Sequence, residues 1–247
     1  MAMLPVSKPS TSVPGRTRSW FAVLLLGLFL SACAQMPASV RSDPSAQSLH
    51  GAKVLIMQPD VEVSELTVGG LLEPNAAWTA AAEINIDRGL ERVLADLGAN
   101  WVHINRNGKL IRSRKVSQLV KLHRIVGTSI RLYEYGRLPP LPSKKGRFEW
   151  TLGRDAAVLG QAYKADYALF VHFRDSFSSD ARIALNVVTS ILFQQAHGGQ
   201  QSGFASLVDL RSGRIVWFNE FRRGSGDLRE AEAAVDASRV LLAALPF

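Results

Sequence analysis

Cysteine usage constrains this fold more than any other feature of the sequence. The chain has 247 residues and one cysteine, Cys33. A single cysteine permits no intrachain disulfide and no Cys-rich zinc site. The folded part must therefore be stabilised by packing alone, and a composition of 47% apolar and 20% charged residues is sufficient for a sizeable core.

The residues before Cys33 are organised like an export signal. Arg16 and Arg18 precede an apolar run of 11 residues, Trp20–Leu30. A helix that spans a bilayer needs roughly 20 apolar residues, so this run is too short to cross one. The pattern predicts a signal peptide over residues 1–32, which leaves a mature part of 215 residues.

The sequence around the cleavage point, Leu30-Ser31-Ala32-Cys33, resembles the lipobox of bacterial lipoproteins. The resemblance implies that Cys33 becomes a lipidated N-terminus, carrying diacylglycerol and an amide-linked acyl chain such as palmitate, and anchors the protein in a membrane. Ala34, in place of an aspartate, implies sorting to the outer membrane, with the protein facing the periplasm. A plain secretory signal with an accidental cysteine is the alternative.

The mature part divides into a tether and one domain. Residues 33–50 are rich in Ser, Ala, Pro and Gln, which predicts a flexible tether. Residues 51–247 have the length of a single domain. Within it, the apolar run over residues 53–59 and the alternating stretch over 61–66 predict one strand, or two with a break at Pro59. Apolar runs predict further strands over 100–104 and 166–174, and the runs over 183–194, 203–210 and 215–221 predict a meander of antiparallel strands.

Helical spacing of apolar residues predicts helices over 78–97, 116–135 and 152–164. Gly98 occupies a C-cap position, whereas Gly127 is unfavourable inside a helix. A last helix is predicted to begin near Asp227, with a capping box to Glu230. The order of elements indicates an α/β domain with a mixed sheet, a strand-helix-strand start and a C-terminal antiparallel hairpin followed by a helix.

The hairpin sequence FASLVDLRSGRIVWFNEF, residues 204–221, together with the lipobox and the strand-helix-strand start, resembles a group of periplasmic lipoproteins. The group includes the curli-secretion lipoprotein, penicillin-binding-protein activators, polysaccharide-secretion lipoproteins and the N-terminal domain of the Tol-Pal translocation protein. The resemblance implies a three-layer, sandwich-like domain that acts as an adaptor or secretion accessory, sometimes as a ring, and not as an enzyme.

Residues with catalytic potential are few. Asp166, Asp175 and Asp209 lie at predicted strand ends, where paired carboxylates could hydrolyse glycans, although aspartates there are more often turn and cap residues. No phosphate-binding glycine motif occurs, so no cofactor is predicted. No metal site is predicted either, because the histidines lack ligand spacing: His50, His103, His123, His172 and His197.

Charge is concentrated in residues 106–147, which hold twelve basic residues and one acidic residue, Glu134. The segment predicts either a solvated helix face and loop or a patch for anionic lipid, glycan or an acidic partner. Export makes nucleic acid the weakest of the anionic partners, and none is predicted. The residues proposed for the patch are Arg112, Arg114, Lys115, Lys121, Arg124, Lys144, Lys145 and Arg147.

Three aromatic residues, Trp78, Trp217 and Phe218, are candidates for an interface, with core packing as the favoured interpretation. Together these features predict a membrane-anchored periplasmic lipoprotein that acts without catalysis as an adaptor in envelope assembly or polymer secretion, through an envelope protein or self-association. The alternatives are an envelope glycan hydrolase and a module that binds anionic lipid or glycan.

Overall fold

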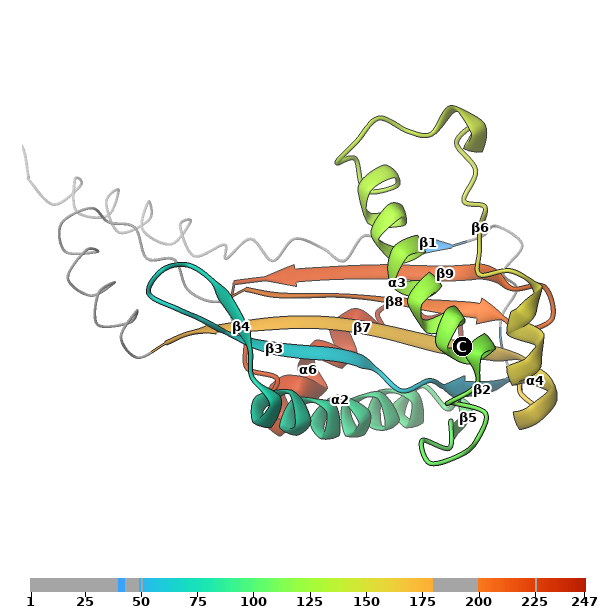
Figure 1. The fold of residues 1–247 in the computed structure, drawn as a ribbon. Coiled ribbons are helices and arrows are strands. Elements are labelled where there is room, and N and C mark those ends of the chain that lie inside the picture. The colour runs from blue at the N-terminus through green and yellow to red at the C-terminus, as the bar shows by residue number, and fades with distance from the viewer. Residues whose placement is uncertain (1–39, 43–48, 50, 180–199, 225) are drawn as a thin grey trace, which may run out of the picture. The chain divides into compact units, whose positions relative to one another are not determined.

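The computed structural model describes residues 40–42, 49, 51–179, 200–224 and 226–247. These residues form one nine-stranded mixed sheet with helices on both faces (Figure 1), which confirms the predicted α/β class. The strands are β1 Arg41–Ser42, β2 Lys53–Ile56, β3 Asp60–Leu66, β4 Leu72–Pro74, β5 Asn100–His103, β6 Trp150–Thr151, β7 Tyr167–Ser178, β8 Gln201–Asp209 and β9 Arg214–Arg223.

The helices of the described residues are α2 Ala76–Asp96, α3 Arg114–Tyr133, α4 Ala157–Tyr163 and α6 Ala231–Leu241, with short 3-10 turns at Pro142–Lys144 and Arg154–Ala156. Asn75 is the N-cap of α2, and its side chain accepts a hydrogen bond from the Trp78 backbone N–H, 3.1 Å away. Ser113 caps α3 in the same way, through the Val116 N–H. Polar caps therefore set the first residue of both long helices.

The long strand β7 is central, as predicted. It pairs in parallel with β2 and, further along, with β3, and antiparallel with β8, which in turn pairs with β9. Pro59 has no backbone N–H, so the run that begins at Lys53 is divided into two strands on the same edge of β7. The predicted C-terminal antiparallel hairpin is confirmed by the pairing of β8 with β9. The first run of the predicted meander, over 183–194, is not among the described residues.

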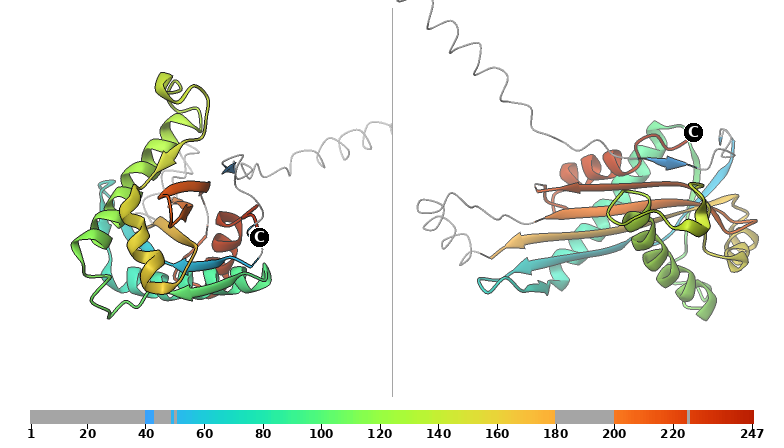
Figure 2. Two further views of the ribbon diagram at one scale, coloured as in Figure 1. Left: turned by 90° about the vertical axis from the view of Figure 1, so that its right-hand side faces the viewer. Right: turned by 90° about the horizontal axis from the view of Figure 1, so that it is seen from above.

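Helices α2 and α6 cover one face of the sheet, and α3 and α4 cover the other (Figure 2), which gives the three predicted layers. Neighbouring residues of β2 alternate between two cores: Val54 and Ile56 face α2, whereas Leu55 faces α3. Trp217 and Phe218 alternate in the same way, and both are fully buried. Core packing is thus confirmed for these two aromatics.

Two helix boundaries differ from the prediction. The last helix begins at Ala231, and no side chain caps it. The Asp227 carboxylate is held by Arg229, whose guanidinium lies 4.5 Å from the Trp78 ring centroid and 4.0 Å from that of Phe177. This clamp holds the chain in a turn before the helix. The third predicted helix is also shorter, because a 3-10 turn occupies Arg154–Ala156.

Part of the predicted tether contacts the domain. Arg41–Ser42 pair antiparallel with Phe218 and Trp217 of β9, and Leu49 is 3% exposed. These residues belong to the folded unit. The predicted signal peptide, Cys33 and the apolar run over 183–194 lie outside the described residues.

Candidate interaction surface

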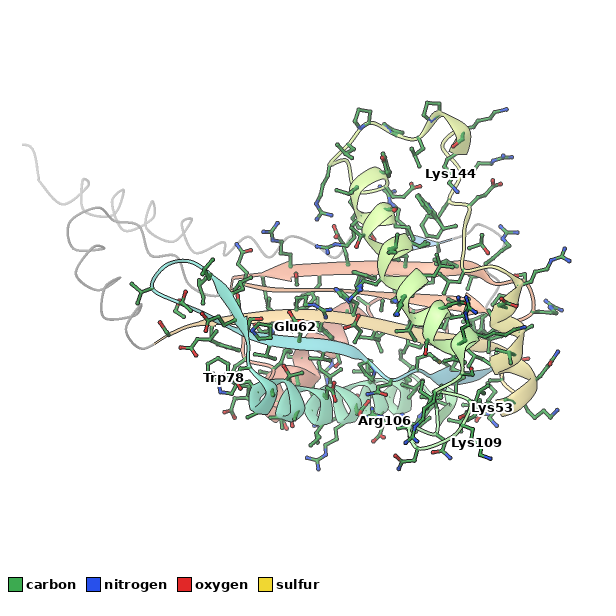
Figure 3. The ribbon with its side chains drawn as sticks, viewed as in Figure 1. Lys53, Glu62, Trp78, Arg106, Lys109 and Lys144 are labelled. Carbon is green, nitrogen blue, oxygen red and sulfur yellow. The ribbon has the colours of Figure 1, made fainter. Side chains whose placement is uncertain are left out.

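Helix α3 divides the eight residues of the predicted basic patch into two groups. Arg112 precedes its first turn, which holds Arg114 and Lys115, and Lys121 and Arg124 follow along the helix. Lys144, Lys145 and Arg147 come after its far end. A helix of 20 residues is about 30 Å long. Figure 3 shows the division, with Lys109 and Lys144 at opposite ends of the helix.

The first group is part of a surface that we call the basic face of α3. It consists of Lys109, Arg112, Arg114, Lys115, Lys121 and Arg124, all exposed. Lys115 forms an exposed ion pair with Asp155, 3.3 Å away. The other five have no ion-pair partner among the described residues. Their charge therefore faces solvent, with no carboxylate of the described residues within ion-pair distance.

Apolar side chains are interleaved with these charges. Ile125 is 63% exposed and Leu122 is 39% exposed, on the same outward side of α3. The inward side carries the buried residues Val116, Leu119, His123 and Ile130. The buried side of α3 packs against the sheet and supplies the core contacts of the helix. The exposed apolar and basic residues make no part of that core.

Other basic residues of the 106–147 segment are neutralised inside the fold. Arg131 Nε and Arg137 Nη2 lie 2.7 and 2.8 Å from opposite oxygens of Glu220, which is only 11% exposed. Arg106 pairs with Asp87 of α2. These pairs join α3 and its flanking loops to the sheet and to α2. Because these three basic residues are paired with carboxylates, the uncompensated charge of the segment is smaller than its formal charge.

A polar groove runs beside α3 and was not anticipated from the sequence. It comprises two adjoining cavities, of about 550 and 430 Å³, that share Glu62 and Arg174 among their lining residues (Figure 3 labels Glu62). Arg174 Nη2 donates to Asp60 Oδ1 at 2.9 Å, and His172 Nδ1 lies 3.0 Å from Asp60 Oδ2. The alternation of polar residues along β3 was the available signal, since it marks one side of a strand as polar.

The surroundings of Asp60 and His172 shift the pKa of both groups. Burial alone would raise the pKa of Asp60, but the hydrogen bond from His172 and the nearby Arg174 guanidinium hold it well below its usual value. Burial lowers the pKa of His172. The Arg174 guanidinium that lines the groove is thus already paired with an ionised carboxylate, that of Asp60.

Of the three strand-end aspartates, Asp166 and Asp209 lie near each other and line one cavity of about 490 Å³, whereas Asp175 lies at the far end of β7. Asp166 and Asp175 are separated by nine residues along one extended segment, about 30 Å, far beyond the 5–9.5 Å that glycosidases use. Asp175 is 4% exposed and accepts hydrogen bonds from Gln201 and the Leu228 N–H. Asp166 accepts from the Lys53 N–H, and Asp209 from two N–H groups of its own turn.

The three described histidines have structural partners, whereas His50 and His197 lie outside the described residues. His123 is 3% exposed, and its Nε2 lies 2.9 Å from Ser206 Oγ. His103 Nε2 lies 2.7 Å from Glu91 Oε1. Across the described ranges, no group of three potential metal ligands occurs. None of the helices described there is both long and apolar enough to span a membrane.

Comparison with known proteins gives neighbours but no family. No family model and no curated protein matches the chain. Among solved structures, the chain is similar to the PelC dodecamer from Paraburkholderia phytofirmans, with 13% identity, 85% of this chain and 97% of that chain covered, and a TM-score of 0.39.

Two further solved structures are similar to the chain. Lipoprotein GNA1162 from Neisseria meningitidis has 13% identity, with 71% of this chain and 81% of that chain covered and a TM-score of 0.30. The LpoB C-terminal domain from Salmonella enterica has 16% identity, with 74% and 88% covered and a TM-score of 0.27. One neighbour is thus named a lipoprotein, the class that the lipobox resembles, but identities and TM-scores this low do not place the chain in a family.

Proposed function

We propose that this protein is a lipid-anchored periplasmic lipoprotein of the outer membrane that acts without catalysis as an adaptor in envelope assembly or polymer secretion. Cys33 is the lipidation site in this proposal, and its acyl chains supply the membrane anchor. The domain supplies the contact with a partner.

The basic face of α3 is the observation that supports an adaptor role. Five exposed basic residues there lack an ion-pair partner among the described residues, and exposed Ile125 and Leu122 lie among them. A surface of this composition is complementary to an acidic protein surface with an apolar centre, since charges at the rim steer association and apolar groups at the centre contribute affinity. The partner is an envelope protein or a second copy of this chain.

The experiment is affinity purification of the tagged full-length protein from gently solubilised membranes, followed by mass spectrometry and measurement of the native mass. We expect a stoichiometric partner or an assembly of copies that dissociates as salt is raised from about 0.05 to 0.5 M, because screening shortens electrostatic range. The double variant Lys121→Glu/Arg124→Glu is expected to lose the complex.

The matched control is Arg88→Glu/Arg211→Glu, which changes the net charge equally at exposed residues of α2 and of the β8–β9 turn. It should retain the complex. A clean monomer in both wild type and control contradicts the adaptor role. For the anchor, Cys33→Ala is expected to release the protein into the soluble fraction, and full function of that variant would count against any need for the anchor.

The contacts of the aspartates favour structural roles over the glycan hydrolase alternative. Asp166 and Asp175 lie far apart, and although Asp166 and Asp209 line one cavity, all three carboxylates accept a hydrogen bond from a backbone N–H. The test of the hydrolase alternative is glycan cleavage by the purified protein, with Asp166→Asn and Asp175→Asn as variants. Cleavage that is lost in both variants while they remain folded would favour the hydrolase over the adaptor.

A further inference from the structure

Residues 136–147 form a loop that extends beyond the end of α3, away from the sheet (Figure 1). Its sequence, GRLPPLPSKKGR, contains no acidic residue. Leu138 is 41% exposed, and the two prolines that follow it are also exposed. Lys145 and Arg147 are exposed on the returning part of the loop. The loop thus combines an apolar tip with adjacent basic residues.

Contacts with the domain hold this loop in place. Its first turn is closed by the Leu138 N–H, which donates to the Leu132 carbonyl at 2.8 Å. Arg137 is fixed to Glu220 by two hydrogen bonds of 3.0 and 2.8 Å. On the return, the Lys144 ammonium lies 4.3 Å from the Trp150 ring centroid. The exposed apolar residues therefore lie on a loop whose two ends are fixed to the domain.

The tether from Cys33 reaches the domain at the same place. Arg41 donates from Nη2 to the Glu134 carbonyl at 2.9 Å, and its Cζ lies 5.7 Å from the Tyr135 ring centroid. Glu134 and Tyr135 immediately precede the loop. Val40 is only seven residues after Cys33, a separation of at most about 25 Å when the chain is fully extended. A lipid on Cys33 would thus keep this end of α3 close to the bilayer.

We propose that the 136–147 loop docks on an anionic phospholipid surface. Leu138 and the prolines enter the headgroup region, while Lys145 and Arg147, the latter 63% exposed beside its ion-pair partner Glu149, lie against lipid phosphates. The inference rests on the lipid anchor of the proposed function and extends it. A lipidated cysteine alone lets the domain rotate relative to the membrane, whereas a second contact fixes its orientation. That orientation leaves the basic face of α3, toward the other end of the helix, available to a partner.

The test uses the full-length lipidated protein in vesicles and measures the depth of two sites. Cys33 is acylated under the proposed function, so Leu138→Cys supplies a single free thiol for an environment-sensitive fluorophore. The matched control is Leu122→Cys on the outward side of α3, where the native leucine is 39% exposed against 41% for Leu138. In vesicles with anionic phospholipid, brominated lipid should quench the label at position 138 and leave the label at position 122 unchanged.

Charge reversal tests the contact between the basic residues and the lipid headgroups. This control is needed because the fluorophore at position 138 is itself apolar. In the Leu138→Cys protein, Lys145→Glu and Arg147→Glu should each reduce the quenched fraction by about fivefold, and zwitterionic vesicles should reduce it similarly. The same reversal at Lys121 and Arg124 should have no effect. Near-ultraviolet circular dichroism establishes that each variant is folded.

The outcomes separate the inference from the proposed function. If the protein floats with vesicles but the label at position 138 is not quenched, docking of the loop is wrong and the anchor stands. If the wild-type protein does not float at all, the anchor is wrong and the inference falls with it. Burial of the label only after an acidic envelope protein is added would identify a protein contact in place of lipid.

Discussion

Gly127 marks the closest approach of α3 to the sheet. A Cβ built there would lie 2.1 Å from Cε2 of Phe204, a buried ring on β8. We expect Gly127→Ala to destabilise the protein by about 1–3 kcal/mol, because the overlap with Phe204 exceeds the roughly 1 kcal/mol gain in helix propensity. Urea unfolding measures the change. Gly69→Ala, where the nearest atom is 3.9 Å away, is the control and should change stability little.

His123 gives stability a dependence on pH. Burial lowers its pKa to about 3, from an ordinary value of 6.5, so the unfolded chain binds a proton that the folded protein excludes. The stability that depends on neutral His123 is therefore fully present above about pH 7. It declines as the pH falls below about 6.5, the pKa of histidine in the unfolded chain. Between pH 7.5 and 5.5 this histidine should contribute a loss of about 1.4 kcal/mol in the unfolding free energy, to which His172 adds in the same direction.

Urea unfolding at the two pH values tests the prediction, with His123→Gln as the comparison. Glutamine cannot titrate and can still reach Ser206, so the variant should lose less stability at pH 5.5 than the wild type does. An equal loss in both proteins would show that His123 is not the responsible group.

At the scale of elements, Glu220 couples α3 to β9. It is 11% exposed and serves Arg131 and Arg137, whose side chains are 21% and 35% exposed. Glu220→Ala leaves both guanidiniums without their carboxylate, and after allowing for solvent screening we expect a loss of about 2 kcal/mol. Hydrogen exchange near the end of α3 should accelerate. Glu149→Ala, which removes the exposed partner of Arg147, should cost less than about 1 kcal/mol.

At the scale of the whole molecule, the two cores share one sheet. Leu55 and Ile56 are adjacent and fully buried, but they face opposite layers. Leu55→Ala and Ile56→Ala should each cost about 2–5 kcal/mol, and each should shift one common unfolding transition, because neither layer retains its core without the sheet. Fluorescence and circular dichroism followed together measure this. Ile84→Ala, at a site 52% exposed, is the control.

Local physics could be predicted from the sequence alone. The helices over residues 76–96 and 114–133 follow from apolar spacing, and Gly98 ends the first of them with φ +68°, as its position predicts. The central strand and the hairpin turning at Gly213 follow from continuous apolar runs and turn residues. Each depends on neighbours a few residues apart, which the sequence displays directly. The lipidation of Cys33 stays a prediction of the same kind.

Only the tertiary structure decided which distant residues meet. Asp227 was expected to cap a helix, but Arg229, stacked on Trp78 and Phe177, takes its carboxylate. The patch predicted as one surface is divided by the length of α3, and Glu220 neutralises two of the neighbouring arginines. These outcomes depend on strand order and on where helices cross the sheet. The spacing of residues along the chain reveals neither the strand order nor the helix positions, because sheet pairing joins residues that are far apart in sequence.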